Sequence, residues 1–315
     1  MRPPIRYPQL IVKEIQQPAS GIRVVILADE DDWPLPPFRI GAHIDLHLSN
    51  GMVRTYSICN EPSDASRYVI AVKIEPNGRG GSSYIHNSLR IGQKVNVSLP
   101  RAGLDDSSAM HVYIAGGIGV TPFLSAIREL EKRGATNYFL HWVSEGDPAL
   151  LSWIQTSYES GRVKIYDTSK EPIPNIAEMV SVYGPDVHLS CCGPAGMLAD
   201  FERAVQGRDP ASVHIERFVP IPQMAALSHS TYKVVLALSN KEIYVQSHQT
   251  LLASLQENEV GIPVSCEGGL CGACKVRWLE GTPIHRDTCL TPNERNEYMM
   301  VCVGGCSSER LILDL

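Results

Sequence analysis

The chain has 315 residues, of which 43% are hydrophobic and 20% are charged, and its formal net charge at pH 7 is −6. This length predicts two or three domains with adequate cores, and the acidic balance argues against nucleic acid as a partner. No run approaches the roughly 18 apolar residues of a membrane span, and residues 1–7 carry no apolar signal-peptide core. Nine cysteines without a secretory signal fit a cytoplasmic protein with a metal centre better than they fit disulfides.

Residues 1–104 contain six short runs with the composition and turn boundaries of β-strands. Asn50-Gly51 predicts a tight hairpin between the third and fourth runs, because both residues tolerate a positive φ. The proline-rich segment 33–37 predicts a loop. Six short, closely spaced strands predict an antiparallel β-barrel. The runs are 9–17, 21–29, 43–49, 52–58, 67–74 and 93–99.

The fourth run contains the quartet Arg54-Thr55-Tyr56-Ser57. On a strand, Arg54 and Tyr56 share one face, while Thr55 and Ser57 share the other. An arginine binds phosphate with two parallel hydrogen bonds, and a tyrosine offers an aromatic surface with a hydroxyl. Such a quartet is common, and taken alone it also fits an ordinary surface strand.

A glycine-rich turn follows the fifth run. Val72 and Lys73 end that run, and residues 77–83 then open a helix-like run at 84–89. A glycine-rich turn that enters a helix presents free N–H groups to an anion. The alternative is a flexible hairpin loop with a helix cap.

Beyond the polar linker 105–108 the pattern changes to alternating strands and helices. An apolar strand at 111–115 precedes a glycine turn and a helix at 123–133, with Thr121 as the N-cap, Pro122 in the first helical position and Gly134 at C′. This βαβ repetition predicts an α/β domain with a parallel sheet. The further strands are 138–143, 163–167 and 187–191, and the further helices are 148–159, 172–182 and 195–205.

Two strand-to-helix turns are candidate dinucleotide sites. Gly116-Gly117-Ile118-Gly119 follows one strand and Cys192-Gly193-Pro194 follows another, and ligands of parallel sheets bind at these carboxyl ends. A helix N-terminus behind the turn suits a pyrophosphate. The pattern is not G-x-G-x-x-G, and a glycine turn alone also fits a tight βα connection. Cys191 fits a buried core thiol.

Asp167 ends the strand at 163–167, where a carboxylate can accept a hydrogen bond from a ribose hydroxyl and repel a 2′-phosphate. The loop at 144–147 carries acidic residues and no Arg or Lys. Both features favour NADH over NADPH. A capping Asp in a turn explains the residue equally well, so this alternative stays open.

The last part of the chain follows a two-proline linker at 219–230. A hairpin with strands at 233–238 and 242–246, a helix at 250–258 capped by Thr250, and strands at 275–279 and 310–315 predict an α+β domain.

The segment 266–274 contains three cysteines spaced C-x4-C-x2-C, the plant-type arrangement for a [2Fe–2S] cluster. Its small residues allow unusual backbone angles and let N–H groups approach sulfur. Structural zinc, the alternative, favours two short Cys-x2–4-Cys pairs. The candidates for the fourth ligand are Cys289, Cys302 and Cys306.

Together these motifs resemble the ferredoxin reductase superfamily: R-x-Y-S at 54–57, G-G-x-G-x-T-P at 116–122 and C-G-P at 192–194. With the cysteine segment, their order resembles the phthalate dioxygenase reductase family over nearly the whole chain. The resemblance implies an FMN-binding β-barrel at 1–104, an NAD-binding α/β domain at 105–228 and a plant-type β-grasp ferredoxin at 229–315.

The resemblance also implies residue roles. Ser57 and Cys192 would lie nearest hydride transfer, and Phe218 would lie over the flavin. The cofactor would be FMN, although residue chemistry alone does not exclude FAD. The flavin residues would be Arg54, Tyr56, Ser57, Val72, Lys73, Gly80, Gly81, Ser82 and Phe218. The NADH residues would be Gly116, Gly117, Thr121, Asp167, Cys192, Gly193 and Pro194.

Met299-Met300-Val301-Cys302 resembles the family's M-x-V-C segment, which makes Cys302 the fourth ligand beside Cys266, Cys271 and Cys274. The family implies an NADH-dependent reductase whose cluster passes single electrons to a Rieske-type aromatic oxygenase or O-demethylase. The aromatic substrate would never touch this chain. The alternative function is a flavin and iron–sulfur redox sensor that regulates a partner without turnover.

Overall fold

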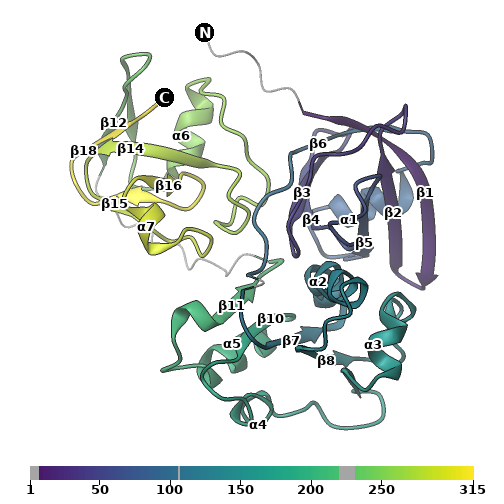
Figure 1. The fold of residues 1–315 in the computed structure, drawn as a ribbon. Helices are drawn as coiled ribbons and strands as arrows, with labels where there is room; N and C mark the ends of the chain where they lie inside the picture. The colour runs from purple at the N-terminus through teal and green to yellow at the C-terminus, as the bar shows by residue number, and fades with distance from the viewer. Residues whose placement is uncertain (1–6, 106, 220–230) are drawn as a thin grey trace. The chain divides into compact units, whose positions relative to one another are not determined.

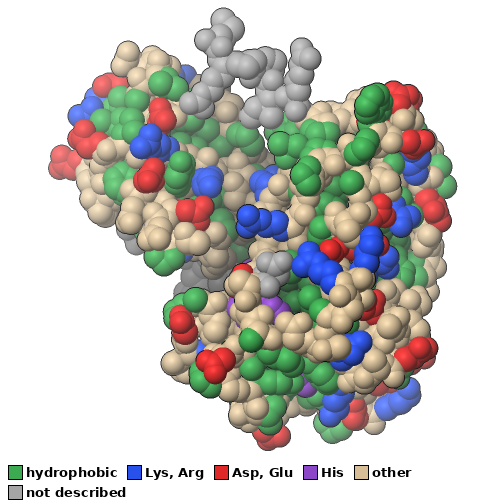
Figure 2. All heavy atoms as spheres, in the orientation of Figure 1, with side chains coloured by type: hydrophobic (Ala, Val, Ile, Leu, Met, Phe, Trp, Pro, Cys, Tyr) green, Lys and Arg blue, Asp and Glu red, His purple; other side chains and the backbone are tan. Residues whose placement is uncertain are grey.

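The computed structural model describes residues 7–105, 107–219 and 231–315 of a chain with two compact units, Met1–Phe218 and Val219–Leu315 (Figure 1). Apart from Val219, the expected linker at 219–230 lies outside the described residues, as does the expected domain boundary at 228/229. Among the described helices, none has the length and apolar character needed to span a bilayer. On the face drawn in Figure 2, acidic and basic side chains are interspersed on both units.

The first unit begins with the predicted antiparallel sheet. Its six strands follow the order β4-β3-β6-β1-β2-β5. Cys59, which follows β4, donates its N–H to the Val69 carbonyl of β5 (2.7 Å), so the two ends of the sheet contact each other. Gly51, at φ 84°, makes the predicted turn between β3 and β4. The strands are β1 (Gln9–Ala19), β2 (Ile22–Ala28), β3 (His43–His47), β4 (Val53–Ser57), β5 (Tyr68–Lys73) and β6 (Lys94–Val97).

The glycine-rich turn after β5 leads into a short helix, α1 (Gly81–Asn87), which begins three residues earlier than predicted. Gly80 precedes it at φ 79°, a left-handed conformation that glycine adopts without the steric penalty of a Cβ. The helix has no side-chain cap. The first N–H groups of the helix therefore have no side-chain acceptor at the N-cap position.

The second half of this unit is a five-stranded, fully parallel sheet in the order β11-β10-β7-β8-β9. On the central strand β7, side chains of alternate residues point to opposite faces of the sheet and so enter two separate cores. Tyr113 and Ala115 pack with α2, while Val112 and Ile114 pack with α4 and α5. The elements are β7 (His111–Gly116), α2 (Thr121–Lys132), β8 (Tyr138–Ser144), α3 (Gln155–Glu159), β9 (Val163–Asp167), α4 (Ile176–Ser181), β10 (His188–Cys192), α5 (Ala195–Ala204) and β11 (Val213–Glu216).

Two predicted helices are shorter than expected. The helix at 148–159 is a 3-10 turn (Leu151–Ile154) followed by α3, because Ile154 at φ −128°, ψ 36° interrupts the helical path. The helix at 172–182 begins only at Ile176, capped by Asn175. Pro174 explains this late start, since a proline disfavours helical geometry in the residue before it.

The predicted cap of α2 was wrong. The residues at 117–120 form a 3-10 turn, Val120 is the N-cap, and Thr121 is already helical. Thr121 Oγ1 donates to Ile118 O (3.0 Å), so its hydroxyl stabilises the turn instead of accepting from the helix. Pro122 accordingly occupies the second helical position, and Gly134 follows the helix at φ 68° as predicted.

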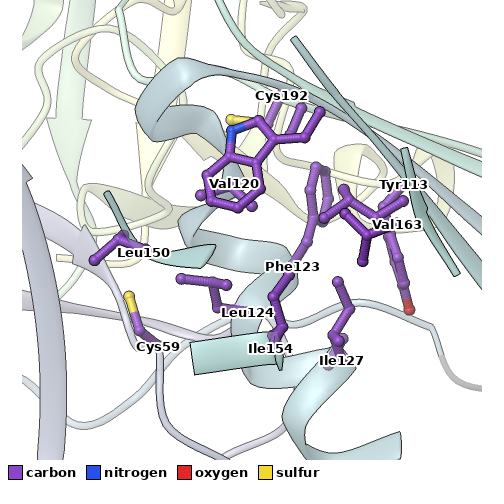
Figure 3. Packing of buried hydrophobic residues seen from close by; sticks show 14 of the residues in the cluster. Cys59, Tyr113, Val120, Phe123, Leu124, Ile127, Leu150, Ile154, Val163 and Cys192 are labelled. Carbon is purple, nitrogen blue, oxygen red and sulfur yellow. The ribbon is translucent and has the colours of Figure 1, made fainter. Parts of the chain in front are cut away.

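One hydrophobic core joins the barrel to the parallel sheet. Cys59, Val69 and Leu104 from the barrel half pack in the same cluster as Phe123 and Leu124 of α2. Figure 3 shows Cys59 near Leu124 and Leu150. Burial of these side chains therefore stabilises both halves together, which explains why they form a single compact unit.

The second unit is the predicted α+β fold. Its mixed sheet has the order β13-β12-β18-β14-β16, and α6 contributes Leu251, Leu252 and Leu255 to the core. Thr250 Oγ1 accepts from Ala253 N (3.1 Å), which confirms the predicted cap. The elements are β12 (Tyr232–Leu236), β13 (Lys241–Val245), α6 (Leu251–Glu257), β14 (Lys275–Glu280), β15 (Pro283–Ile284), α7 (Pro292–Arg295), β16 (Tyr298–Met300), β17 (Gly305–Cys306) and β18 (Arg310–Leu313).

Candidate functional site

The strand β4 and the turn before α1 lie against each other in the first unit, with the Arg54 side chain between them. Arg54 Nη1 donates to Val53 O (2.8 Å), and Arg54 Nη2 donates to Arg79 O. Gly81 makes room for this guanidinium, because a Cβ there would lie 2.8 Å from Arg54 Nε. The structure therefore brings the R-x-Y-S strand and the glycine-rich turn together.

The neighbouring polar groups suit an anionic ligand. Ser82 Oγ accepts from Glu75 N (3.0 Å), which leaves its hydroxyl hydrogen available for donation. Tyr56 is half-buried on β4, and burial raises the pKa of its phenol, so the hydroxyl stays protonated. Lys73 is exposed at the end of β5, whereas Val72 is buried and its carbonyl contacts His86 Nε2 (2.9 Å). This donor set fits a phosphate beside an aromatic ring.

Ser57 connects the barrel to the parallel sheet. Its Oγ donates to Glu216 Oε1 (3.3 Å), although the two residues are 159 positions apart in the chain. Glu216 pairs with Cys192 across β10 and β11. Cys192 is 1% exposed, and burial raises the pKa of its thiol, with Glu216 adding to the effect. A hydroxyl, a carboxylate and a neutral thiol thus converge at the carboxyl end of this sheet.

Glu216 was missed in the sequence analysis. It lies in the segment 213–218, where only Phe218 received a role. The available signal was its place at the carboxyl end of the last parallel strand, where ligands of such sheets bind. Phe218 lies two residues beyond the end of β11 and is 45% exposed.

The two glycine-containing turns of the parallel sheet pack directly against each other. A Cβ at Gly116 would lie 2.6 Å from Pro194 Cδ and 3.2 Å from Gly193 Cα. A Cβ at Gly119 would lie 2.7 Å from the carbonyl carbon of Cys192. Gly117 has a φ of 54°. Glycine at these positions therefore lets the turns approach closely at the edge where a dinucleotide would bind.

Asp167 has the contacts of a capping residue. Its Oδ1 accepts from Gly146 N (2.8 Å) and from the Ser169 hydroxyl (2.6 Å), and Lys170 Nζ lies 2.7 Å from Oδ2. Lys170 and these donors hold the pKa of the Asp167 carboxyl well below its usual range. The carboxylate therefore stays ionised at the end of β9.

The four proposed cluster ligands form two pairs in the second unit. The thiol of Cys271 contacts that of Cys266, and the thiol of Cys302 contacts that of Cys274. Three of the four residues are buried and Cys266 is partly exposed. Among the described residues, no three His, Cys, Asp or Glu side chains converge as they would around one ion. Two pairs of thiols fit two metal atoms better than a single tetrahedral zinc.

Backbone N–H groups of the segment point at sulfur. Gly268 N and Leu270 N each lie 3.4 Å from Cys266 Sγ, to which they donate. The Cys271 thiol and these N–H groups lower the pKa of Cys266, because they stabilise its thiolate. Glu267 (φ 53°), Gly269 (φ 72°) and Gly272 (φ 73°) all have left-handed backbone angles. Such a loop fits a thiolate-bound cluster, since hydrogen bonds to sulfur tune iron–sulfur centres.

The other two candidate cysteines have different surroundings. Cys306 lies on β17, where its Sγ is 3.1 Å from Ser308 Oγ and 3.7 Å from Arg310 O. Cys289 accepts a hydrogen bond from the Gly272 backbone, and burial raises the pKa of its thiol to about 12. Cys302 contacts the thiol of Cys274, whereas Cys289 has charge interactions with Cys271 and Cys302.

Comparisons with known proteins agree with this geometry. Residues 32–104 match an oxidoreductase FAD-binding domain, and residues 235–304 match a 2Fe-2S iron-sulfur cluster binding domain. The chain is 38% identical to the phenoxybenzoate dioxygenase subunit beta of Ectopseudomonas oleovorans, covering 89% of both chains. It is 35% identical to the phthalate dioxygenase reductase of Burkholderia cepacia, covering 92% of this chain and 91% of that one.

Solved structures give the same result. A phthalate dioxygenase reductase, described as a modular structure for electron transfer from pyridine nucleotides to [2Fe–2S], matches with a TM-score of 0.70 and 32% identity over 98% of both chains. A type IV self-sufficient cytochrome P450 monooxygenase matches with a TM-score of 0.88 and 27% identity. That match covers all of this chain but only 43% of the monooxygenase. With relatives above 30% identity matched over most of both chains, the protein belongs to the phthalate dioxygenase reductase family of oxidoreductases, which combine a flavin-binding domain with a 2Fe–2S domain.

Proposed function

We propose that the protein is an NADH-dependent reductase that uses FMN and a [2Fe–2S] cluster to pass single electrons to a separate, Rieske-type oxygenase or O-demethylase. The contact between Ser57 and Glu216 is the observation that carries this proposal. It joins the R-x-Y-S strand to β11, whose Glu216 pairs with Cys192 of β10, and this supports flavin and nicotinamide sites that lie next to each other. The domains would be 1–104 for flavin, 105–228 for nucleotide and 229–315 for the cluster.

The first unit would hold the flavin and bring NADH to it. We assign the FMN phosphate to Arg54, Ser82 and the Gly80-Gly81 turn, and the flavin ring to Tyr56, Ser57, Val72, Lys73 and Phe218. We assign the dinucleotide to Gly116, Gly117, Thr121, Gly193 and Pro194. Ser57 and Cys192 would lie at the reacting centre. The chemistry supplied by the bound groups is hydride acceptance by the flavin and single-electron transfer through the cluster.

The roles of the chain's own residues follow from their contacts. Glu216 would hold the Ser57 hydroxyl in one orientation, since the two are hydrogen-bonded. Cys192 would exclude water as a neutral thiol, because it is buried and its pKa is raised. In the second unit, Cys266, Cys271, Cys274 and Cys302 would bind the cluster.

An anaerobic titration with NADH tests the function. We expect the purified protein to show flavin and [2Fe–2S] absorbance, both of which bleach when NADH is added, and to reduce cytochrome c. Bound chromophores that NADH does not reduce would overturn the reductase function and favour the redox sensor. A colourless protein that contains zinc would overturn both.

The identity of the flavin is tested by heat release, in which we expect FMN and not FAD. The guanidinium of Arg54 and the hydroxyl of Ser82, both groups that can donate to phosphate oxygens, support a terminal phosphate at this position. Recovery of FAD would refute the choice of cofactor without affecting the reductase function. The nine thiols support action in a reducing compartment, which we propose is the cytoplasm.

Asp167→Ser is expected to lower the ratio of kcat/KM for NADH to that for NADPH by about tenfold or more. The substitution removes the carboxylate that would repel a 2′-phosphate and releases Lys170, whose Nζ lies 2.7 Å from it. Initial rates with both nucleotides measure the ratio. Exposed Glu171→Gln is the matched control and should leave it unchanged. An unchanged ratio in Asp167→Ser would show that this carboxylate only caps the turn.

A further inference from the structure

A buried carboxylate lies beside the cysteine segment of the second unit. Asp287 belongs to the turn between β15 and α7, and the exposed fraction of its side chain is 1%. No function was assigned to it from the sequence. Lone carboxylates are rarely buried so completely, because desolvation of the charge costs free energy that only good partners offset.

The partners of Asp287 satisfy only one of its two carboxylate oxygens. Oδ2 accepts from Leu290 N (3.0 Å) and lies 3.5 Å from Arg295 Nη2, which also donates to Asp287 O (2.7 Å). Oδ1 has no hydrogen-bond partner among residues 7–105, 107–219 and 231–315. The nearest basic atom recorded for it is His285 Nδ1 at 3.7 Å. The negative charge is therefore incompletely compensated.

The same turn packs directly on the cysteine segment. Thr288 N donates to Gly269 O (3.1 Å), and a Cβ at Gly269 would lie 3.0 Å from Asp287 Cα and 2.8 Å from Val303 Cγ2. Val303 follows the proposed ligand Cys302 in the sequence. Gly269 lies between the two residues whose N–H groups point at Cys266 Sγ. The backbone around Asp287 thus fixes the position of the donors that face sulfur.

We propose that Asp287 is a positioning residue for the cysteine segment and that its carboxylate lowers the reduction potential of the bound cluster. The proposal rests on the proposed function in requiring a cluster at this site. Net charge and hydrogen bonds to sulfur are two of the factors that set the potentials of such clusters. A negative charge fixed in a region of low dielectric opposes the arrival of an electron nearby.

The test is a redox titration of the full-length holoprotein followed by electron paramagnetic resonance. Asp287→Asn keeps the shape of the side chain and removes its charge. At a fixed potential the ratio of reduced to oxidised cluster should rise about tenfold, which equals 59 mV for a one-electron couple. Exposed Glu309→Gln removes the same charge elsewhere in this unit and should leave the ratio within about twofold, because water and salt screen exposed charges.

A second variant keeps the proposal testable if Asp287→Asn binds no cluster. Arg295→Gln removes the cation that partly neutralises Asp287, so the reduction potential of the cluster in this variant should shift to more negative values. Cluster-loaded Asp287→Asn without a shift, or a positive shift in Arg295→Gln, would refute the electrostatic role. If Asp287→Asn loses the cluster, the positioning role is supported, and the direction of the potential shift in Arg295→Gln then tests the electrostatic role. A wild-type protein without a cluster would instead overturn the proposed function.

Discussion

A Cys302→Ser variant is expected to lose most of its [2Fe–2S] absorbance, whereas Cys306→Ser keeps it. The thiol of Cys302 contacts that of Cys274, while Cys306 contacts Ser308 and the Arg310 carbonyl on a different strand. Replacing a residue that only hydrogen-bonds to a metal ligand already lowers metal affinity about 10–100-fold. Loss of the ligand itself should therefore lower the affinity for the cluster at least as much. Iron and acid-labile sulfide per chain measure the occupancy.

Flavin content is the internal control for this experiment, because the flavin site is expected in the first unit and should be unchanged in both variants. Cys289→Ser is a useful third variant, since Cys289 is close enough to bond the Gly272 backbone. It should keep the cluster, because its thiol bonds to the Gly272 backbone and is not one of the four proposed ligands. A cluster that survives in Cys302→Ser and disappears in either other variant would refute the ligand assignment.

Gly119→Ala is expected to lower the free energy of unfolding of the first unit by about 1–3 kcal/mol, the usual cost of overpacking. The new Cβ would lie 2.7 Å from the Cys192 carbonyl carbon and 3.0 Å from Gly193 N. Both atoms belong to the backbone, so no side-chain rotation relieves the clash. Since the Cys192 turn must move, the KM for NADH should also rise.

The matched control is Gly196→Ala in the first turn of α5, where a Cβ would have nothing within 4 Å. It should stabilise the helix by up to about 1 kcal/mol, because alanine has the higher helix propensity. Denaturant unfolding followed by flavin release measures the first unit of both variants. Equal stability in Gly119→Ala and the wild type would contradict the close packing of the two turns.

Local patterns in the sequence predicted most of the fold. Every strand predicted in the barrel and in the parallel sheet forms, because strand composition, apolar runs and turn residues act over a few positions. The errors came from competing local effects. Pro174 delays one helix, Ile154 interrupts another, and the Thr121 hydroxyl bonds to a 3-10 turn that the sequence did not reveal.

The site was predictable where a motif is continuous and unpredictable where it depends on distant pairing. The C-x4-C-x2-C spacing identified three cysteines within one segment. Glu216 and Asp287 gave no such signal. Glu216 gains its partner from a strand 159 positions away, and the importance of Asp287 lies in its burial beside Gly269. Charge environments of this kind are created by tertiary packing.

The shared core of the barrel and the parallel sheet has a consequence for how such a chain can be recombined. Separating the two halves near residue 104 would expose Cys59, Val69 and Phe123 to water, whereas the second unit buries its own cluster of apolar residues. The boundary between the two compact units leaves the apolar clusters on either side of it intact. Gene fusion or exchange at that boundary would therefore replace the 2Fe–2S domain while leaving the core of the flavin-binding unit unchanged.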